Sequence, residues 1–400
     1  MKILHTADWH LGKKLDYFSR LAEQKKVMSE IVEIAEEQKV DLVLIAGDLF
    51  DNFNPGTEAI DLFFQTLVKL SDNGKRPVVA IAGNHDSPAF IDTPNSLARA
   101  NGIILIGYPK ALIKQFKLDD FEVINSKEGF VEIKLNRFDY PVRIIHTAYA
   151  NEVRLKEYLG EEKDKGLNEV LAAHWQQLAD DFFDEKGVNL LMTHLYMNKA
   201  GGVILEEPDG EKPIKIGNAD MVFSEAIPVQ TQYTALGHLH AYNNVGSEEK
   251  PVVYSSSPLC YSFSEAGQKK FVLIVDAEPG SVVNFQKIEL KSGRQLVRKE
   301  FDDVDKAIEW LTENPSVLIE LTLVSDGFLK AEDRQRILRS HDGIIYLIPK
   351  VKSTESGNTE REEINLNLNE KELFKTYFQS KNGGQLPGED LMNLLNEILN

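Results

Sequence analysis

Residues 41–51 read DLVLIAGDLFD, an almost uninterrupted apolar run that leads directly into two aspartates. An apolar run without polar alternation is typical of a strand that is buried on both faces of a sheet. Similar runs cover residues 2–7 and 77–83. Stretches with apolar residues spaced by three and four follow each run, the last of them near 91–100. This alternation predicts βαβ units in which helices cover a central sheet.

Beyond residue 100, short apolar strands lie on either side of a mixed-charge helical segment at 152–183. The strands are predicted at 103–108, 130–135, 142–149, 189–193, 233–237, 252–255 and 271–276. We interpret this return to strands, which we expect to be antiparallel, as a second sheet. The predicted fold class is therefore α/β, with a two-sheet α/β sandwich over residues 1–275.

The rest of the chain is predicted to be separable. Residues 276–352 contain two helical and two strand patterns, enough for a small α/β domain. The segment 353–363 (STESGNTEREE) is polar and without periodicity, which predicts a linker. Residues 364–400 hold two short amphipathic helical patterns, and such helices need a surface to cover their apolar stripes. We interpret them as partner-binding helices, and folding back onto their own small domain is the alternative.

The composition limits the classes of protein to be considered. Of 400 residues, 42% are hydrophobic and 27% are charged, which is ordinary for a globular protein with a buried core. No apolar run approaches the roughly 18 residues of a spanning helix, and the N-terminus lacks the apolar core of a signal peptide. A single cysteine, Cys260, excludes an internal disulfide framework. We therefore expect a cytoplasmic protein that does not contact membranes.

The charge balance restricts how the chain could act on nucleic acid. There are 45 Lys and Arg against 63 Asp and Glu, which gives a net charge of −18. Such an acidic chain does not hold a polyanion by bulk electrostatics, so bound cations, a local basic strip or a basic partner would have to do so. The sequence also has no Gly-x-x-x-x-Gly-Lys-Ser/Thr loop, so any dependence on ATP would come from a partner.

Polar clusters follow the predicted strands at the point where each strand ends. They are Asp8-Trp9-His10, Gly47-Asp48-Leu49-Phe50-Asp51, Gly83-Asn84-His85-Asp86, Thr193-His194 and Gly237-His238-Leu239-His240. Because the carboxyl ends of strands form the rim where α/β sheets bind ligands, we expect these clusters to converge in space. Asp and neutral His are ligands for borderline divalent cations such as Mn²⁺, Fe²⁺ or Zn²⁺. Glycines at the strand ends would let the backbone bend sharply into the ligand loops.

The histidines indicate a metal site when they are taken together. A single Asp-x-His or His-x-His motif would be only weak support for metal binding. Five of the 9 histidines lie in the strand-end clusters, whereas His5 and His146 lie within strands and are interpreted as core residues. In an extended Asp-x-His or His-x-His segment both side chains lie on one side and can reach one ion. A carboxylate such as Asp48 can bridge two ions, and two ions about 3.5–4 Å apart can clamp a phosphoryl group and activate the attacking water.

The ordered set of motifs resembles that of a known superfamily. Asp-x-His, Gly-Asp-x-x-Asp, Gly-Asn-His-Asp, a lone His and Gly-His-x-His occur in this order in calcineurin-like metallophosphoesterases. Within them the chain is most similar to the bacterial SbcD-type nuclease subunits, through residues 8–12 (DWHLG), 83–88 (GNHDSP) and 254–263 (YSSSPLCYSF). The resemblance covers the whole chain, strongly to about residue 275 and weakly beyond. It implies a metallophosphoesterase core with a small α/β capping domain and C-terminal helices.

The resemblance also implies a role for each site residue. One metal ion would be held by Asp8, His10 and His240, and the other by Asn84, His194 and His238, with Asp48 as the bridge. His85 would be a catalytic residue rather than a ligand, because it would stabilise the charge that develops on the scissile phosphate and protonate the leaving oxygen. Asp51 would orient or charge the His85 imidazole, and a turn or helix-capping role is the alternative.

Contacts to the substrate rest on a local basic cluster. Lys13, Lys14 and Arg20 would hold a DNA backbone, and a solvated helix start is the alternative interpretation. Related phosphatases often have Arg-Gly after the residue that corresponds to Asp51, whereas this chain has Asn52-Phe53, which favours a nuclease. Without a zinc finger or an arginine-rich arm, DNA would be recognised through its phosphates and its shape.

The resemblance thus implies a DNA exonuclease and endonuclease subunit that uses two Mn²⁺ ions to hydrolyse phosphodiester bonds at DNA ends and hairpins. It would act in DNA repair, recombination and replication as a homodimer, within a heterotetramer that contains the SMC-like ATPase SbcC. Two other classes stay open: a phosphoesterase for a cyclic nucleotide or a phosphoprotein, and a non-enzymatic scaffold. Residues 300–400 favour the nuclease, because a stand-alone small-molecule enzyme has little need of a capping domain and tethered helices.

Overall fold

The computed structural model describes residues 1–156, 163–207, 221–325, 329–351, 370–381, 386–388, 391–392 and 395. They belong to two compact units, Met1–Lys350 and Val351–Asn400. In the smaller unit, helix α9 (Glu370–Lys381) corresponds to the first predicted C-terminal helix. The predicted linker at 353–363 and most of the second C-terminal helix lie outside the described residues.

The first sheet of the larger unit has six strands in the order β18-β17-β1-β4-β5-β6. Its parallel part consists of β1 (Lys2–Thr6), β4 (Leu42–Ala46), β5 (Val78–Ile81) and β6 (Ile103–Ile106). Strand β17 (Phe271–Asp276) pairs antiparallel with β1, and β18 (Asn284–Glu289) pairs antiparallel with β17. The sheet therefore continues past the predicted domain boundary at residue 275.

The second sheet has eight strands in the order β15-β16-β14-β11-β10-β9-β8-β7. Its antiparallel strands are β7 (Phe116–Lys117), β8 (Phe121–Lys127), β9 (Phe130–Leu135) and β15 (Asn243–Asn244). Its parallel strands are β10 (Val142–Thr147), β11 (Val188–His194), β14 (Tyr233–Gly237) and β16 (Val252–Tyr254). The expectation of antiparallel pairing was wrong for the pairs β10–β11, β11–β14 and β14–β16. Parallel neighbours need a crossover connection, which the helical segment supplies between β10 and β11.

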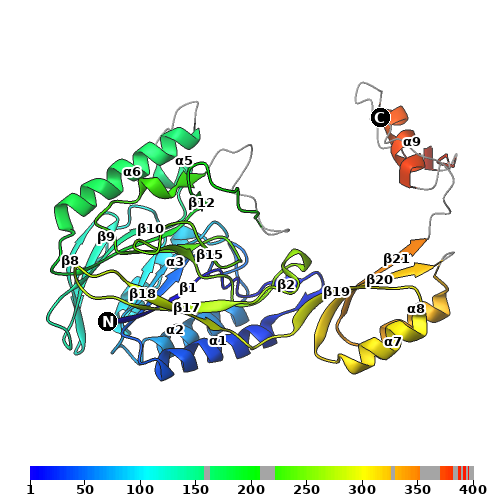
Figure 1. The fold of residues 1–400 in the computed structure, drawn as a ribbon, viewed down its shortest axis with the longest axis horizontal. Coiled ribbons are helices and arrows are strands. Elements are labelled where there is room, and N and C mark those ends of the chain that lie inside the picture. The colour runs from blue at the N-terminus through cyan, green and yellow to red at the C-terminus, as the bar shows by residue number, and fades with distance from the viewer. Residues whose placement is uncertain are drawn as a thin grey trace. The chain divides into compact units, whose positions relative to one another are not determined.

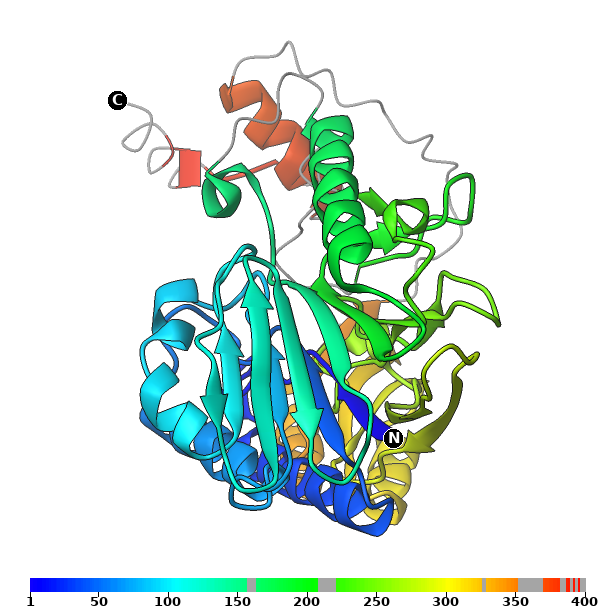
Figure 2. The ribbon, with the colours of Figure 1, turned by 90° about the vertical axis from the view of Figure 1, so that its left-hand side faces the viewer.

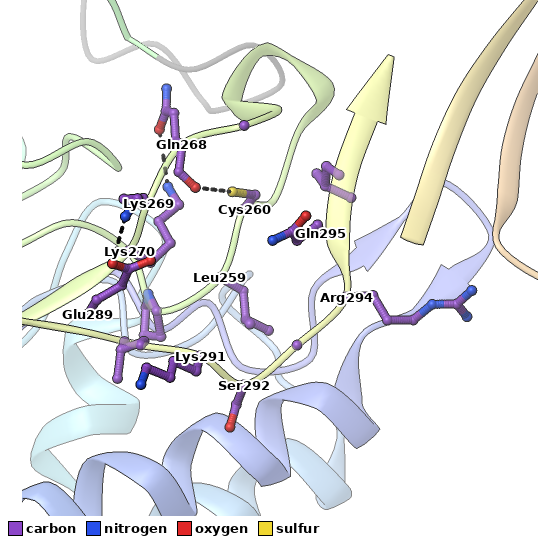
Figure 3. A pocket seen from close by; sticks show the side chains of 15 residues that line it. Leu259, Cys260, Gln268, Lys269, Lys270, Glu289, Lys291, Ser292, Arg294 and Gln295 are labelled. Atoms are coloured by element: carbon purple, nitrogen blue, oxygen red, sulfur yellow. Dashed lines mark hydrogen bonds and ion pairs between the residues drawn. The ribbon is translucent and has the colours of Figure 1, made fainter. Parts of the chain in front are cut away.

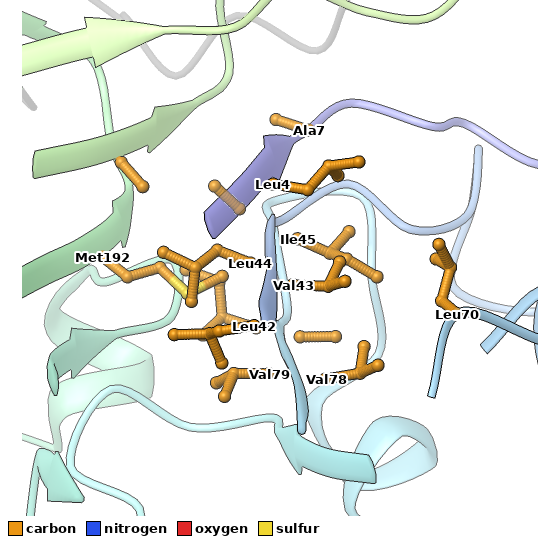
Figure 4. Packing of buried hydrophobic residues seen from close by; sticks show 14 of the residues in the cluster. Leu4, Ala7, Leu42, Val43, Leu44, Ile45, Leu70, Val78, Val79 and Met192 are labelled. Atoms are coloured by element: carbon orange, nitrogen blue, oxygen red, sulfur yellow. The ribbon is translucent and has the colours of Figure 1, made fainter. Parts of the chain in front are cut away.

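The two sheets face each other, and helices cover their outer faces (Figures 1 and 2). In Figure 4, Leu42 and Leu44 of β4 lie on the side of Met192 from the second sheet, whereas Val43 and Ile45 lie on the side of Leu70. This alternation buries both faces of β4, as the apolar run predicts. Helices α1 (Leu21–Glu37) and α2 (Thr57–Leu70) cover the first sheet, and α6 (Lys163–Phe182) covers the second. The predicted α/β class with a two-sheet sandwich is confirmed.

The predicted helix near 91–100 is instead two short helices, α3 (Pro88–Asp92) and α4 (Asn95–Ala100). Pro94 separates them, because proline has no N–H to donate and its ring clashes with the preceding turn. The remaining short elements are α5 (Glu152–Leu155), β2 (Lys14–Leu15), β3 (Phe18–Ser19), β12 (Met197–Asn198), β13 (Val222–Phe223), η1 (Ser224–Ala226) and η2 (Phe263–Glu265). None of the described helices is long and apolar enough to span a membrane.

The end of the larger unit is a three-stranded sheet in the order β19-β20-β21. It contains β19 (Gln295–Phe301), α7 (Val304–Glu313), β20 (Val317–Ser325), α8 (Ala331–Ser340) and β21 (Ile344–Val351). This part of the chain thus has three strands rather than the two predicted. An apolar cluster that includes Leu15, Phe263, Leu318 and Ile345 joins this sheet to loops of the sandwich.

Candidate metal centre

The polar clusters that follow the strands meet in space, as the strand-end argument predicts. Their ligand atoms form three groups, each within 4.8 Å: Asp8, His10 and His240; Asp48, His194 and His238; and His10, Asp51 and His85. Asn84 joins the second group, because its Oδ1 lies 2.9 Å from His194 Nε2. The structure thus brings together every residue that was expected to bind metal, although they come from the end of β11 and from the loops after β1, β4, β5 and β14.

The backbone of these loops is strained where the ligands lie. Asp8, His10, Asp48 and His238 have φ angles of 54°, 43°, 46° and 106°, in the region that residues with side chains rarely adopt. Such conformations persist only where surrounding contacts impose them, and they concentrate at functional sites. Here the loop after β1 is bonded to the loop after β4, since Asp8 N donates to Gly47 O at 3.0 Å and His10 N donates to Asp48 O at 2.9 Å.

The strand-end glycines mainly allow neighbouring backbone and side-chain atoms to approach their Cα atoms closely. A Cβ atom on Gly83 would lie 2.1 Å from Asp48 Oδ1, and one on Gly237 would lie 1.8 Å from Ala46 O. Of the strand-end glycines, Gly47 has the positive φ, +91°, that the expectation of a sharp bend requires. At Gly83 and Gly237 a larger residue does not fit, because a neighbouring strand or loop packs directly against the backbone and leaves no room for a Cβ atom.

Asp86 connects two of the ligand loops, a role that the sequence analysis missed. Its buried carboxylate accepts hydrogen bonds from Leu49 N at 3.0 Å, Phe50 N at 2.9 Å and Gly83 N at 2.8 Å. Burial raises the pKa of Asp86, while the three backbone donors oppose this rise. The carboxylate therefore holds the loop of Asp48 beside the loop of Asn84. The sequence feature that could have indicated this role is the position of Asp86 in a strand-end cluster.

The first group is a set of buried donors that suits a divalent cation. His10 Nε2 lies 3.0 Å from His240 Nε2 and 3.5 Å from Asp48 Oδ2. Asp8 Oδ1 accepts a hydrogen bond from His238 N, but its buried Oδ2 has no hydrogen-bond partner among the described residues. Burial raises the pKa of Asp8 to about 7. A buried carboxylate oxygen without a donor is costly, and a cation held here would balance it.

The second group shares Asp48 with the first. His194 Nε2 lies 3.3 Å from Asp48 Oδ2, and His194 Nδ1 is hydrogen-bonded to Ala46 O at 2.8 Å. Burial would lower the pKa of His194, but Asp48 and Asp8 raise it to about 9. Conversely, burial would raise the pKa of Asp48, but the flanking histidines hold it well below its usual range. The carboxylates of Asp48 and Asp8 therefore stabilise positive charge at His194, and a bound cation would take the place of the proton on this ring.

His85 and Asp51 are adjacent, but the contact differs from the expected one. His85 N donates to Asp48 Oδ1 at 2.9 Å, and His85 Nδ1 is hydrogen-bonded to the backbone carbonyl of Asp51 at 2.8 Å. The carboxylate of Asp51 instead pairs with Lys13 Nζ at 3.1 Å and lies 3.7 Å from His10 Nδ1. His10 and Lys13 lower the pKa of Asp51 against the effect of burial. The contact that orients His85 thus comes from the main chain of Asp51.

The three residues expected to contact DNA lie in different environments. Lys14 is exposed, and Lys13 is partly buried beside Asp51. Arg20 is fully buried, where its guanidinium bonds to both carboxylate oxygens of Glu23 and to Cys260 O at 2.7 Å. The expectation that Arg20 contacts DNA is therefore corrected, because its charge is already paired in the interior.

Arg154 is a second residue near the site that the sequence analysis did not find. Its guanidinium donates to Gly83 O and Asp86 O, each at 2.8 Å, and lies 4.8 Å from the ring centre of Tyr149. It therefore supports the backbone of the loop that carries Asn84 and His85. No local sequence signal indicates this, because Arg154 is 71 residues away from Gly83 along the chain.

Comparisons with known proteins show the family to which the chain belongs. The family model described as calcineurin-like phosphoesterase matches residues 1–224. The chain is 36% identical over 409 residues to the SbcD subunit of nuclease SbcCD from Bacillus subtilis (strain 168), an alignment that covers 100% of this chain and 97% of that protein. A dimetal phosphatase from Danio rerio aligns with 73% of this chain and 99% of its own, at a TM-score of 0.38 and 12% identity. The chain therefore belongs to the calcineurin-like phosphoesterase family, among the SbcD-type nuclease subunits, and is a metal-dependent hydrolase.

Proposed function

We propose that this chain is a Mn²⁺-dependent DNA exonuclease and endonuclease that hydrolyses phosphodiester bonds at DNA ends and hairpins. The observation that carries the proposal is the pair of buried ligand groups on either side of Asp48. The name of the Bacillus subtilis relative, the SbcD subunit of nuclease SbcCD, supports DNA as the substrate and SbcC as the partner. The proposed setting is DNA repair and recombination.

The donor set fits two divalent ions. Asp8, His10 and His240 would hold one ion and Asn84, His194 and His238 the other, with Asp48 shared between them. Mixed imidazole, carboxylate and amide donors suit Mn²⁺ better than Mg²⁺ or Ca²⁺, which favour oxygen ligands alone. When bound, two such ions hold the phosphoryl oxygens and activate the attacking water.

His85 is the proposed catalytic residue. Its backbone N–H is bonded to Asp48, so the ring lies beside both ligand groups without belonging to the proposed ligand set. With Nδ1 bonded to the Asp51 carbonyl, Nε2 is the ring nitrogen that exchanges a proton with the substrate. The same ring would stabilise negative charge as it develops on the phosphate.

DNA binding cannot come from bulk charge, since the chain carries a net charge of −18. In the proposed function the two ions neutralise the reacting phosphate, and Lys13 and Lys14 contact the adjoining backbone. Lys14 is exposed for this purpose, whereas Lys13 would first have to leave Asp51.

The proposed assembly is a homodimer that binds the ATPase SbcC. Support for the partner comes from the name of the relative and from the apolar residues at helical spacing in α9. In α9, the rings of Phe374 and Phe378 lie 6.1 Å apart. An amphipathic helix of this kind is suited to docking in a groove of a partner.

The test is a nuclease assay on a duplex with one blocked end and on a hairpin, with and without Mn²⁺ and the partner. We expect nucleotide release that requires Mn²⁺. The variant His85→Ala should still bind two ions and DNA but lose cleavage by on the order of 10²–10⁴-fold, because only transition-state stabilisation is removed. Faster hydrolysis of a cyclic nucleotide or a phosphopeptide than of DNA would instead favour the alternative substrate class. Near-normal cleavage by His85→Ala would contradict the role of His85.

A further inference from the structure

A buried carboxylate and a buried ammonium lie behind His240, and the proposed mechanism uses neither. Glu265 ends the short helix η2, and its Oε1 lies 3.3 Å from His240 Nδ1. Lys270 Nζ donates to Glu265 Oε2 at 2.5 Å. The side chains of His240, Glu265 and Lys270 are only 1%, 2% and 5% exposed. Charges this deeply buried are retained only where they are paired and hydrogen-bonded.

The two nitrogens of the His240 ring have different neighbours. Nε2 lies 3.0 Å from His10 Nε2, within the first ligand group, whereas Nδ1 lies beside Glu265. A neutral imidazole that binds a metal through one nitrogen carries its proton on the other. An ionised carboxylate can only accept hydrogen bonds, so Glu265 selects the tautomer that has the proton on Nδ1. The lone pair is then on Nε2, on the side of Asp8 and His10.

Glu265 is itself fixed in place. Its Oε1 also accepts hydrogen bonds from Tyr261 N and Ser262 N, each at 3.0 Å. Lys270 Nζ bonds to the other carboxylate oxygen and to His240 O at 2.7 Å. It also bonds to Gln268 Oε1 at 3.3 Å (Figure 3). Lys270 therefore balances the charge of Glu265 and also holds the main chain of His240. The carboxylate and the imidazole cannot shift independently of each other.

His194 in the second group has a different support. Its Nδ1 is bonded to the main-chain carbonyl of Ala46, which is a neutral acceptor. A charged carboxylate behind a ligating imidazole fixes the ring and raises its basicity. The removal of such a partner typically costs about 10–100-fold in metal affinity.

We propose that Glu265, held by Lys270, is a positioning residue that fixes the tautomer and orientation of His240 and so sets the affinity of the ion at Asp8, His10 and His240. This inference rests on the proposed ligand set. It assigns a role in metal retention to Glu265 and Lys270, which lie outside the strand-end clusters. The effect should fall mainly on the ion at Asp8, His10 and His240.

The test compares Mn²⁺ binding by the full chain and by three variants, measured by calorimetry and by electron paramagnetic resonance of the bound Mn²⁺. Glu265→Gln keeps the side-chain shape but removes the charge. We expect the Kd of one ion to rise by about 10–100-fold while the other ion keeps its affinity. The double variant Glu265→Gln/Lys270→Met removes both buried charges together, which is far less destabilising than leaving one unpaired. It should show the same rise in Kd even if the single variant does not fold.

The matched control is Glu132→Gln, which removes the charge from a partly buried ion pair elsewhere in the sandwich. Glu132 pairs with Arg143 at 2.8 Å between β9 and β10, and both Kd values should stay at the wild-type level in this variant. Wild-type affinity for both ions in the double variant would overturn the inference, as would an equal loss of both ions. A lower melting temperature with unchanged Kd values would likewise overturn it, because it would show a purely structural role. If the wild-type chain bound fewer than two ions, the proposed metal centre would fail and this inference with it.

Discussion

Replacement of Asp86 by alanine would remove the carboxylate that joins the loops after β4 and β5. In the wild-type chain this carboxylate accepts hydrogen bonds from Leu49 N, Phe50 N and Gly83 N. Asp86 is fully buried, so water does not replace the lost acceptor without rearrangement of the loops. The predicted consequence is a less stable sandwich in which the Asp48 loop is no longer tied to the Asn84 loop.

The magnitude follows from the number of donors that lose their acceptor. A buried donor left without a partner costs about 1–3 kcal/mol, and Asp86→Ala leaves three of them. Burial raises the pKa of Asp86, so the substitution also relieves part of the cost of burying this carboxylate. We therefore expect the lower end of the range, a fall of about 3 kcal/mol in the free energy of unfolding of the metal-free protein.

The assay is urea unfolding of the metal-free protein followed by tryptophan fluorescence. Trp9 and Trp175 are both fully buried, so their emission reports on the packing of the sandwich. The matched control is Asp92→Ala, because the partly buried Asp92 carboxylate accepts one backbone hydrogen bond, from Gly107 N at 2.7 Å. It should lose about 1 kcal/mol. A loss in Asp86→Ala no larger than that in Asp92→Ala would refute the reasoning.

Three further predictions concern the metal centre, the strand ends and the C-terminus. Asp48→Ala should lose both ions together while Cys260→Ser keeps them, measured by elemental analysis; two ions retained in Asp48→Ala would contradict the bridging position. Gly237→Ala should be destabilised towards the upper end of the about 1–3 kcal/mol that overpacking costs, because its new Cβ would meet a backbone carbonyl at 1.8 Å. Gly56→Ala, which meets nothing within 4 Å, should show no overpacking cost in the same urea assay, and equal losses would exclude the steric explanation. A chain that ends at Lys352 should remain dimeric and keep Mn²⁺-dependent cleavage but fail to co-purify with SbcC; a stable complex would rule out docking through the C-terminal helices.

Local sequence patterns were sufficient for the central sheet and for locating the polar clusters at the strand ends. The apolar runs at 41–47 and 77–83 correspond to β4 and β5, and the helical spacing predicted after the first of these runs corresponds to α2. These features depend on residues a few positions apart, so their periodicity is visible without a structure. The convergence of the strand-end clusters within each sheet follows from the same information, because parallel strands place their carboxyl ends on one edge. The packing of the two sheets then brings the clusters after β1, β4 and β5 together with those of β11 and β14.

Local patterns were insufficient to predict the contacts of residues whose partners are remote in the chain. Arg20 reads as a surface charge, but one of its partners is a carbonyl 240 residues away, and this contact helps to bury it. The parallel pairing of β11 with β14 also joins segments that are remote in the sequence. Likewise, Glu265 lies 25 residues beyond its partner His240. In each case the free energy of folding depends on which polar groups come together in the buried interior. A pattern of neighbouring residues therefore shows which apolar side chains face inward, whereas the packed fold determines which charges are buried and which partners they find.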